Sequence, residues 1–410
     1  MKGFSTKAIH GKAFRKDPHG SLRFPLYDAV AFEHESARDI QLAFEGRKPA
    51  HMYSRITNPT VEDFEQRINL ISDSLSAVAV SSGMAAISNL ILTIAESGSN
   101  IITTKFLFGN TYSLFEQTLK PWGLNVRYIN MDDLDMLRSS INAKTRVIFL
   151  EMITNPQLQV SDIQAISKVA REYSVPLVVD GTLTTPYIFK SKDYGVSVEV
   201  LSSTKYISGG GTTVGGLIID NGTFNWEKCP KLEGSVKKYG EFALIIKLKR
   251  EVYRNLGACL APHNAYLQTL GLETLSLRID KSCANTLQVS EHLEKCEKVR
   301  SVNYPGLKTS KYHEIARAQF KDKFGGMLTF ELENKENCFA FMDGLKLIKR
   351  ASNINDNKTL ILHPESTLFC EYSPEEKMEM GVGDSMLRLA VGIEDVEDII
   401  ADINLGLEGI

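Results

Sequence analysis

The chain has 410 residues, of which 43% are hydrophobic and 24% charged, and its formal net charge is −3. This composition is typical of a soluble globular protein, and the length exceeds one ordinary core, so we expect two domains. A mildly acidic chain with well-mixed charges excludes the basic face that nucleic-acid binding needs.

The six cysteines are scattered without a CxxC pair, and the eight histidines show no HxxxH spacing. From this pattern we expect reduced thiols and no metal site. The first residues, MKGFSTKAIHGKAF, lack the apolar core of a signal peptide. No apolar run approaches the roughly 20 residues that span a bilayer. We therefore expect a cytoplasmic protein without a membrane partner.

Residues 1–60 show no sustained periodicity and carry scattered Gly, Pro and His. Because such a segment buries little of its own surface, we predict an extended arm that lies across another subunit. Residues 61–71 then show a helical pattern, with Phe64 and Ile68 on one face. Thr60 is the predicted N-cap of this helix, and Asp63 is its predicted capping-box carboxylate.

Between residues 76 and 180, short apolar runs alternate with helical stretches. The predicted strands are 76–80, 100–104, 124–129, 146–152 and 176–180, and the predicted helices are 81–95, 111–119 and 161–173. This alternation indicates βαβ units and a parallel sheet that is covered on both faces. Ligands bind beyond the carboxyl ends of such strands, where the sequence places Gly83, Asn155, Asp180 and Lys205.

Residues 198–216, VEVLSSTKYISGGGTTVGG, hold Lys205 between a hydroxyl cluster and a glycine-rich loop. Glycine lets the backbone approach a ligand closely, and hydroxyls with free N–H groups can bind a phosphate. Upstream, the buried strand PLVVD ends in Asp180. A lysine that can form a Schiff base and a carboxylate that can hold a pyridinium nitrogen are the minimum that pyridoxal phosphate (PLP) needs. The sequence therefore predicts PLP as cofactor.

Each of these signals also has an ordinary structural interpretation. Lys205 alone is most often a solvated lysine, and Asp180 alone can cap a helix or a turn. The loop is not a Walker loop, because no Gly-Lys-Ser/Thr closes it. It is not a dinucleotide fingerprint either, because Val214 stands where the last glycine is needed. Only the joint occurrence of these features favours a cofactor site.

From about Cys259 the pattern changes to long helical stretches, followed by strands over 325–332 and 386–393 and a closing helix over 395–407. This pattern predicts a smaller α+β domain. We place the arm at 1–60, the PLP-binding domain at 61–260 and the C-terminal domain at 261–410.

Four further positions carry candidate chemistry beside an ordinary alternative. Met84 lies in a run that opens a helix, where free N–H groups fit a phosphate, although a serine N-cap explains the run equally well. Phe108 can stack on a flat ring or pack in the core, and Asn155 offers an amide or a turn. Arg388, on an apolar strand, needs an anion, which is either a substrate carboxylate or an internal acid.

The chain resembles the Cys/Met-metabolism (trans-sulfuration) PLP enzymes in a joint set of segments, which are YSRITNPT, SSGMAAI, EMITNP, VVDGT, SSTKYISGGGTTVGG and LRLAVGIED. The resemblance covers essentially the whole chain. It implies an α/β PLP-dependent transferase of fold type I, with a large mostly parallel sheet, and a homotetramer built of tight dimers. By this resemblance Lys205 is the Schiff-base lysine and Asp180 the pyridinium partner. The resemblance implies that the cofactor's phosphate is held by Gly83, Met84, Ser202 and Thr204, together with Tyr53 and Arg55 of a neighbouring subunit. It implies that the substrate or the cofactor's phenolic oxygen is bound by Asn155, Asn353 and Arg388.

The runs KYISGGGTTVGGLIIDNGTFNW and SNINDNKTLILHPES are similar to O-acetylhomoserine sulfhydrylases. Asn353 replaces a more usual serine, Asn110 replaces the cysteine of typical methionine γ-lyases, and Phe108 replaces a ring-stacking tyrosine that can protonate the leaving group. A carboxylate, with a conjugate-acid pKa near 4, leaves unprotonated more readily than a thiolate, at roughly 8.5. Phe108 therefore favours an O-acyl-homoserine over methionine or cystathionine, although Tyr112 or Tyr53 could replace the missing acid.

We therefore predict γ-replacement on O-acetyl-L-homoserine by sulfide or a small thiol, giving homocysteine or methionine-type products. A methionine γ-lyase, which releases 2-oxobutyrate, thiol and ammonia, is the alternative enzyme. A catalytically idle PLP carrier is the alternative from another class. The set of Lys205, Asp180 and Arg388 argues against the carrier, because a carrier does not need to bind a substrate carboxylate.

Overall fold

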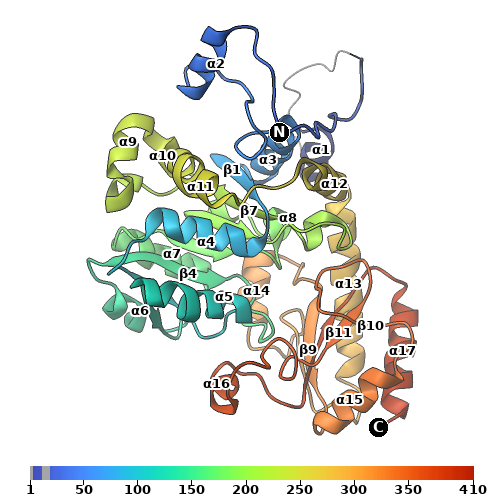
Figure 1. The fold of residues 1–410 in the computed structure, drawn as a ribbon. Helices are drawn as coiled ribbons and strands as arrows, with labels where there is room; N and C mark the ends of the chain where they lie inside the picture. Colours follow the sequence, from blue (N-terminus) through green and yellow to red (C-terminus); the bar gives the residue numbers. More distant parts are fainter. Residues whose placement is uncertain (1–2, 12–18) are drawn as a thin grey trace.

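The computed structural model describes residues 3–11 and 19–410, and two β-sheets organise it (Figure 1). The larger sheet has seven strands in the order β1-β7-β6-β5-β4-β2-β3. These strands are β1 (Ser76–Val80), β2 (Asn100–Thr103), β3 (Asn125–Tyr128), β4 (Thr145–Glu151), β5 (Leu177–Asp180), β6 (Val198–Leu201) and β7 (Gly216–Asp220). Strand β7 is antiparallel to β1 and β6, while the other neighbours are parallel. The predicted mostly parallel sheet is confirmed.

Both faces of the large sheet are buried under helices. Successive side chains of a strand point to opposite faces, so each strand contributes to two hydrophobic clusters. In β1, Val78 and Val80 pack in one hydrophobic cluster, and Ala77 and Ala79 pack in the other. Helix α4 (Gly83–Ile94) covers the first face, and α3 (Pro59–Ser72) and α7 (Ile163–Glu172) cover the second. Strands that are buried on both sides read as continuous apolar runs, which is why their positions could be predicted.

The N-terminus of α3 differs from the prediction. Asn58, and not Thr60, is its N-cap, because Asn58 accepts hydrogen bonds from the backbone N–H groups of Thr60 and Val61. Pro59 fills the first helical position, where its fixed φ and missing N–H fit. The predicted capping box at Asp63 was therefore wrong, and Asp63 instead pairs with Arg67 Nε at 2.9 Å.

The segment before α3 is less extended than predicted. It contains α1 (Phe4–His10), which contacts α3, and α2 (Ala37–Phe44), which lies at the top of Figure 1, apart from both sheets. Ser36 caps α2 by accepting a hydrogen bond from the N–H of Asp39. Residues 1–2 and 12–18 of the predicted arm lie outside the described residues.

The C-terminal part carries a five-stranded sheet in the order β10-β11-β12-β9-β8, which confirms the predicted smaller α+β unit. Its strands are β8 (Ser301–Asn303), β9 (Met327–Glu331), β10 (Lys349–Arg350), β11 (Leu360–Leu362) and β12 (Met386–Ala390). The helices of this part are α12 (Pro262–Glu273), α13 (Leu275–Leu293), α14 (His313–Phe320), α15 (Lys335–Gly344), α16 (Pro374–Glu379) and α17 (Val396–Glu408). Strand β12 pairs with β9 and β11, so Arg388 lies at the centre of this sheet.

The remaining helices belong to the large-sheet part. They are α5 (Gly109–Ser113), α6 (Leu134–Ser140), α8 (Thr185–Ile188), α9 (Glu233–Tyr239), α10 (Ala243–Lys247) and α11 (Arg254–Leu256), with π-helical turns at Leu114–Leu119 and Leu248–Tyr253. None of the helices within residues 3–11 and 19–410 combines the length and the apolar character that a membrane crossing needs.

Candidate active site

A cavity of about 280 Å³ lies where the carboxyl ends of the large-sheet strands face the C-terminal part. It brings together most of the residues that the sequence singled out. Those that line it are Gly83, Met84, Phe108, Asn155, Asp180, Ser202, Thr204, Lys205 and Arg388. Except for Arg388, which comes from β12 of the C-terminal sheet, these residues follow or end strands of the large sheet, and parallel strands all end at one edge.

Lys205 follows β6, and its side chain enters the cavity. Its Nζ donates a hydrogen bond to Asn353 Oδ1 at 2.6 Å. Burial and, to a smaller extent, the Arg388 charge lower the pKa of Lys205, the Asp356 charge opposes them, and the net result is a pKa of about 8. An amine whose pKa is close to neutral is a better nucleophile and proton carrier than a solvated lysine.

The N-terminus of α4 forms another wall of the cavity. Ser82 is the N-cap and accepts a hydrogen bond from the N–H of Ala85 at 3.0 Å, so the serine-cap interpretation was correct. The amides at the start of a helix have no partners within the helix, so those of Gly83 and Met84 are suited to an anion. Gly83 must be glycine here, because a Cβ would lie 2.8 Å from the Cβ of Ser202.

The hydroxyls of the Ser-Ser-Thr run have different partners. Ser202 lines the cavity, and its N–H donates to Thr182 Oγ1 at 2.8 Å. Thr204 Oγ1 accepts from the N–H of Gly215 at 3.0 Å and donates to the carbonyl of Gly215 at 3.1 Å. These bonds fix the strand ends on both sides of Lys205.

Asp180 ends β5, and burial raises its pKa above the usual value. It accepts a hydrogen bond from the N–H of Thr182 at 2.9 Å. A cationic partner would return such a carboxyl to its ionised form, and this is what a protonated pyridine nitrogen supplies.

Glu151 is a cavity residue that the sequence reasoning missed. It lies opposite Asp180 in the β4–β5 pairing. Its carboxylate accepts from the N–H of Phe108 at 2.6 Å and from the N–H of Asn155 at 3.2 Å, so it holds two loops of the site. Burial raises its pKa well above the usual value, and the Asp180 charge adds to the shift. The signal that could have revealed it is an acid at the end of an apolar strand, as at Asp180.

Arg388 is the cation on the opposite wall. It is 3% exposed. Nη1 donates to Asn155 Oδ1 at 3.1 Å and Nη2 to the carbonyl of Asn353 at 3.3 Å. Its Nε has no partner among the described residues. Burial lowers the pKa of Arg388 to about 10. Its described contacts are to an amide and a carbonyl, and a carboxylate ligand would supply the missing counter-charge.

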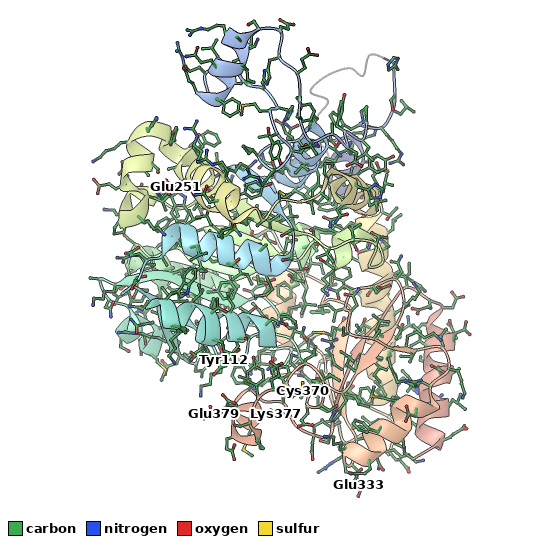
Figure 2. All side chains as sticks on the ribbon, in the orientation of Figure 1. Tyr112, Glu251, Glu333, Cys370, Lys377 and Glu379 are labelled. Carbon is green, nitrogen blue, oxygen red and sulfur yellow. The ribbon has the colours of Figure 1, made fainter. Side chains whose placement is uncertain are left out.

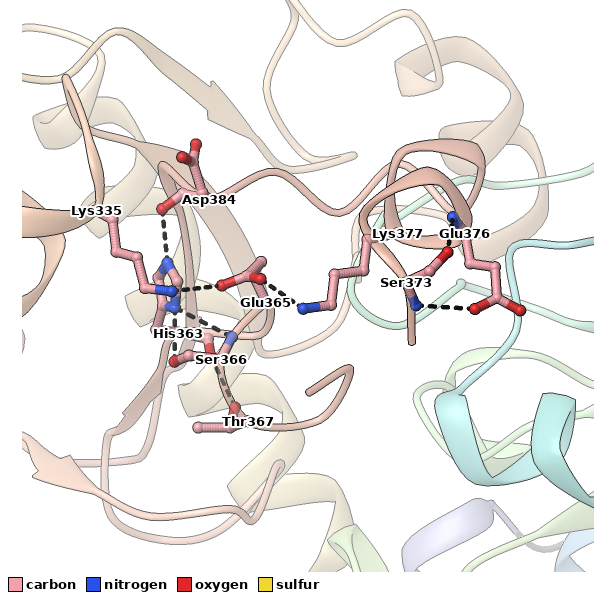
Figure 3. Close-up of polar contacts among 9 residues, drawn as sticks. All are labelled: Lys335, His363, Glu365, Ser366, Thr367, Ser373, Glu376, Lys377 and Asp384. Carbon is pink, nitrogen blue, oxygen red and sulfur yellow. Dashed lines mark hydrogen bonds and ion pairs between the residues drawn. The ribbon is translucent and has the colours of Figure 1, made fainter. Parts of the chain in front are cut away.

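The segment from His363 to Asp384, which includes α16, contributes to the cavity wall and contacts α5. Leu368 lines the cavity, and the Tyr372 hydroxyl donates to the carbonyl of Gly109 at 2.8 Å. Figure 2 shows Tyr112 above the labelled residues of this segment, and Tyr112 stacks edge-on with Tyr372 at 5.6 Å between ring centres. Figure 3 shows Glu365 bridging Lys335 at 2.8 Å and Lys377 at 2.5 Å, which ties the segment to α15.

Tyr53 and Arg55 do not line this cavity. Tyr53 is 41% exposed, and the Arg55 guanidinium lies 5.4 Å from its ring centre. Arg55 Nη1 donates to the carbonyl of Arg254. Asn353 does not line the cavity either, but its side chain contacts Lys205 Nζ. The single chain therefore brings together the predicted site residues with the exception of Tyr53 and Arg55.

The geometry fits PLP. An amine of lowered pKa, a buried acid at a strand end and a helix N-terminus meet in one cavity, and these are the groups that bind its aldehyde, ring nitrogen and phosphate. The fold and the cavity together define a PLP-dependent enzyme of fold type I.

The chain belongs to the Cys/Met metabolism PLP-dependent enzyme family, whose profile matches residues 5–408. It is 37% identical to the L-methionine gamma-lyase of Fusobacterium nucleatum subsp. polymorphum, over 100% of this chain and 98% of the relative. A structure of the O-acetylhomoserine sulfhydrylase of Wolinella succinogenes is 46% identical and covers 86% of this chain and 98% of its own, with a TM-score of 0.77.

A crystal structure from Campylobacter jejuni, provisionally assigned as an O-acetylhomoserine (thiol)-lyase, is 32% identical. It covers 99% of this chain and 100% of its own, with a TM-score of 0.93. That protein carries N'-pyridoxyl-lysine-5'-monophosphate at position 205.

Proposed function

We propose that this enzyme catalyses γ-replacement on O-acetyl-L-homoserine, with sulfide or a small thiol as nucleophile. The observation that carries the proposal is Phe108, whose side chain lines the cavity. Among the described residues, no tyrosine lines that cavity. Acetate needs no proton to leave, because its conjugate acid has a pKa near 4, whereas a thiolate gains from an acid. The similarity to the sulfhydrylase of Wolinella succinogenes supports the same substrate.

The proposed roles of the residues follow from their chemistry. PLP, when bound, supplies an electron sink for the negative charge that develops at the substrate Cα. Lys205 would hold the cofactor and, once released by the substrate amine, would carry protons at Cα and Cβ. Arg388 and Asn155 would orient the substrate carboxylate, and Asp180 would keep the ring nitrogen protonated.

The acetate would leave Cγ with the electron pair of the C–O bond, and the sulfur nucleophile would form the new bond to Cγ. Gly83, Met84, Ser202 and Thr204 would bind the phosphate, and Phe108 would stack on the ring. Asn353 would contact the amine of Lys205, consistent with their 2.6 Å hydrogen bond.

Methionine γ-lyase is the second candidate function, because the Fusobacterium relative with that name is 37% identical over the full chain. Tyr112 was a possible replacement for the missing acid. It packs between Tyr128 and Tyr372 with ring centres at 5.3 and 5.6 Å, and it does not line the cavity. Burial raises the pKa of its hydroxyl, which makes it a weaker acid. This placement argues against Tyr112 as the missing acid and leaves Tyr53 of a neighbouring copy as the other tyrosine for that role.

We also infer that the protein works as a cytoplasmic homotetramer of tight dimers, with an arm at 1–60 and domains at 61–260 and 261–410. In support, the segment before α3 exposes large apolar side chains to solvent. These include Leu22, Val30 and Phe44, which are 104%, 62% and 67% exposed. Contact with a neighbouring copy would bury them and would bring Tyr53 and Arg55 to the phosphate side of its cavity.

Incubation of the purified holoenzyme with O-acetylhomoserine, with and without sulfide, tests the function. We expect rapid homocysteine formation with sulfide and little 2-oxobutyrate. Methionine given alone should release 2-oxobutyrate far more slowly. If methionine is cleaved as fast as O-acetylhomoserine is consumed, the γ-lyase assignment replaces the proposal.

A further inference from the structure

Asp356 is not a cavity residue, yet one side chain connects it to Lys205. Asn353 Nδ2 donates to Asp356 Oδ2 at 3.0 Å, while Asn353 Oδ1 accepts from Lys205 Nζ at 2.6 Å. An amide has one donor end and one acceptor end, and a carboxylate can only accept. Asp356 therefore fixes the amino end of Asn353 toward itself, which leaves the oxygen facing the lysine.

The glycine-rich loop after Lys205 closes over this pair. Gly211 has a φ of +66°, and a Cβ there would lie 2.7 Å from Asp356 Oδ2 and 3.1 Å from Asn353 Nδ2. Asn357 Nδ2 donates to the carbonyl of Gly209 at 3.2 Å. The N–H of Lys358 donates to the other carboxylate oxygen, Asp356 Oδ1, at 3.2 Å. The turn that carries Asp356 is thus held against the loop that carries the lysine.

The charges around Lys205 Nζ indicate what its connection to Asp356 does. Burial and the Arg388 charge both lower the pKa of Lys205, and the Asp356 charge acts in the opposite direction. The other acids of the cavity, Asp180 and Glu151, lie at the ends of β5 and β4. Once the substrate amine displaces Lys205, its Nζ is a free amine that needs a polar partner and a counter-charge in order to carry a proton.

We propose that Asp356 is a positioning residue that acts through Asn353 to hold the released amine of Lys205 for proton transfer at the substrate. The inference rests on the proton-carrying role of Lys205 given above. It does not depend on the leaving group. In the resting enzyme Lys205 is engaged by the cofactor, so the loss of Asp356 should leave that state unchanged and should affect the later steps.

The first test measures exchange of the α-proton of L-norvaline with solvent deuterium by NMR, using the holoenzyme. Norvaline has no leaving group, so the comparison is valid whether or not O-acetylhomoserine is the substrate. We expect Asp356→Ala to slow exchange about tenfold, the scale of one charge-assisted hydrogen bond, with cofactor content and resting visible absorption unchanged. Asp356→Asn keeps an acceptor for Asn353 and should retain more exchange. Asp132→Ala, at an exposed aspartate outside the cavity lining, is the matched control.

The second test measures Lys205 directly, by competitive acylation of the cofactor-free full chain and peptide mass spectrometry. Removing the Asp356 charge in Asp356→Asn should lower the pKa of Lys205, so at neutral pH more of the amine is unprotonated and acylation is faster. Unchanged exchange in Asp356→Ala would overturn the proposal, and so would unchanged acylation in Asp356→Asn. A loss of exchange that only follows a loss of cofactor would overturn it too, since that result describes a structural role.

Discussion

The walls of the cavity and the segment before α3 contribute to the proposed site in different ways. The wall residues are buried and are held by partners of the same chain, as Arg388 is by Asn155 and Glu151 is by the backbone of Phe108. Tyr53, in contrast, lies 41% exposed on the surface. The lysine, ring and carboxylate contacts can therefore be formed within one chain. A contribution from Tyr53 and Arg55 requires a second copy.

Removing the central wall residue should have the largest effect. Lys205→Ala deletes both the cofactor attachment and the proton carrier, and a single general acid or base typically contributes about 10²–10⁴-fold. We expect replacement activity to fall by at least this range, and the visible absorption of the lysine-bound cofactor to disappear. Absorption spectra and turnover of purified protein with added PLP measure both. Unchanged absorption in the variant would contradict the assignment of Lys205.

The arm offers the sharper comparison, because its role depends on a neighbour. If Arg55 contacts the phosphate of an adjacent site, Arg55→Ala should weaken PLP retention roughly 10–100-fold, the value of one charge-assisted hydrogen bond at about 1.5–3 kcal/mol. Equilibrium dialysis of PLP measures this change. Lys237→Ala, which removes an exposed i,i+4 pair with Glu233, serves as a control for the loss of a cation.

Mixing of Arg55→Ala and Lys205→Ala subunits, at a PLP concentration that leaves Arg55→Ala mostly unloaded, tests whether two subunits share one site. In a dimer of one Arg55→Ala and one Lys205→Ala subunit, one of the two sites regains both native residues. Activity should then recover in part. If mass spectrometry verifies mixed dimers and activity stays at the level of the parents, the arm does not complete a neighbouring site.

The same two regions show what the sequence could predict. The strands around the cavity are buried on both faces, so their continuous apolar runs located them, and the motifs at their ends located Asp180 and Lys205. The segment before α3 carries no such pattern. Its short helix α2 depends on a local cap at Ser36, and α1 packs against α3. Weak local signals of this kind do not stand out without tertiary contacts.

Glu151 and Asp356 escaped prediction for another reason. Glu151 ends an apolar strand, and its importance comes from the two backbone N–H groups that it gathers. Asp356 acts through Asn353 on Lys205, and Asn353 and Lys205 are 148 residues apart in the sequence. Both roles depend on long-range proximity, which a single sequence does not contain. The cap at Asn58 was missed for a local reason, because Pro59 starts the helix earlier than the apolar pattern does.

The smallest expected effect concerns Phe108, a wall residue whose side chain cannot donate or accept a proton. Phe108 lines the cavity, and its N–H is fixed by Glu151 at 2.6 Å, so Phe108→Tyr should place a hydroxyl at the site without moving the backbone. A well-placed general acid contributes about 10²–10⁴-fold, and a partly aligned hydroxyl should give about three- to tenfold. Because a thiolate needs a proton more than acetate does, methionine γ-elimination should rise by this factor while acetate loss from O-acetylhomoserine stays nearly constant.

Rates of 2-oxobutyrate and acetate release measure the two reactions. The PLP content of each preparation must match, since the added oxygen enters a packed ring site. Phe115→Tyr, at a fully buried ring in the hydrophobic cluster of Val78 and Val80 that is not a cavity residue, controls for an added hydroxyl in the core. An equal rise of both reactions would show that the ring position does not select the leaving group, and the case for O-acetylhomoserine would lose its structural basis.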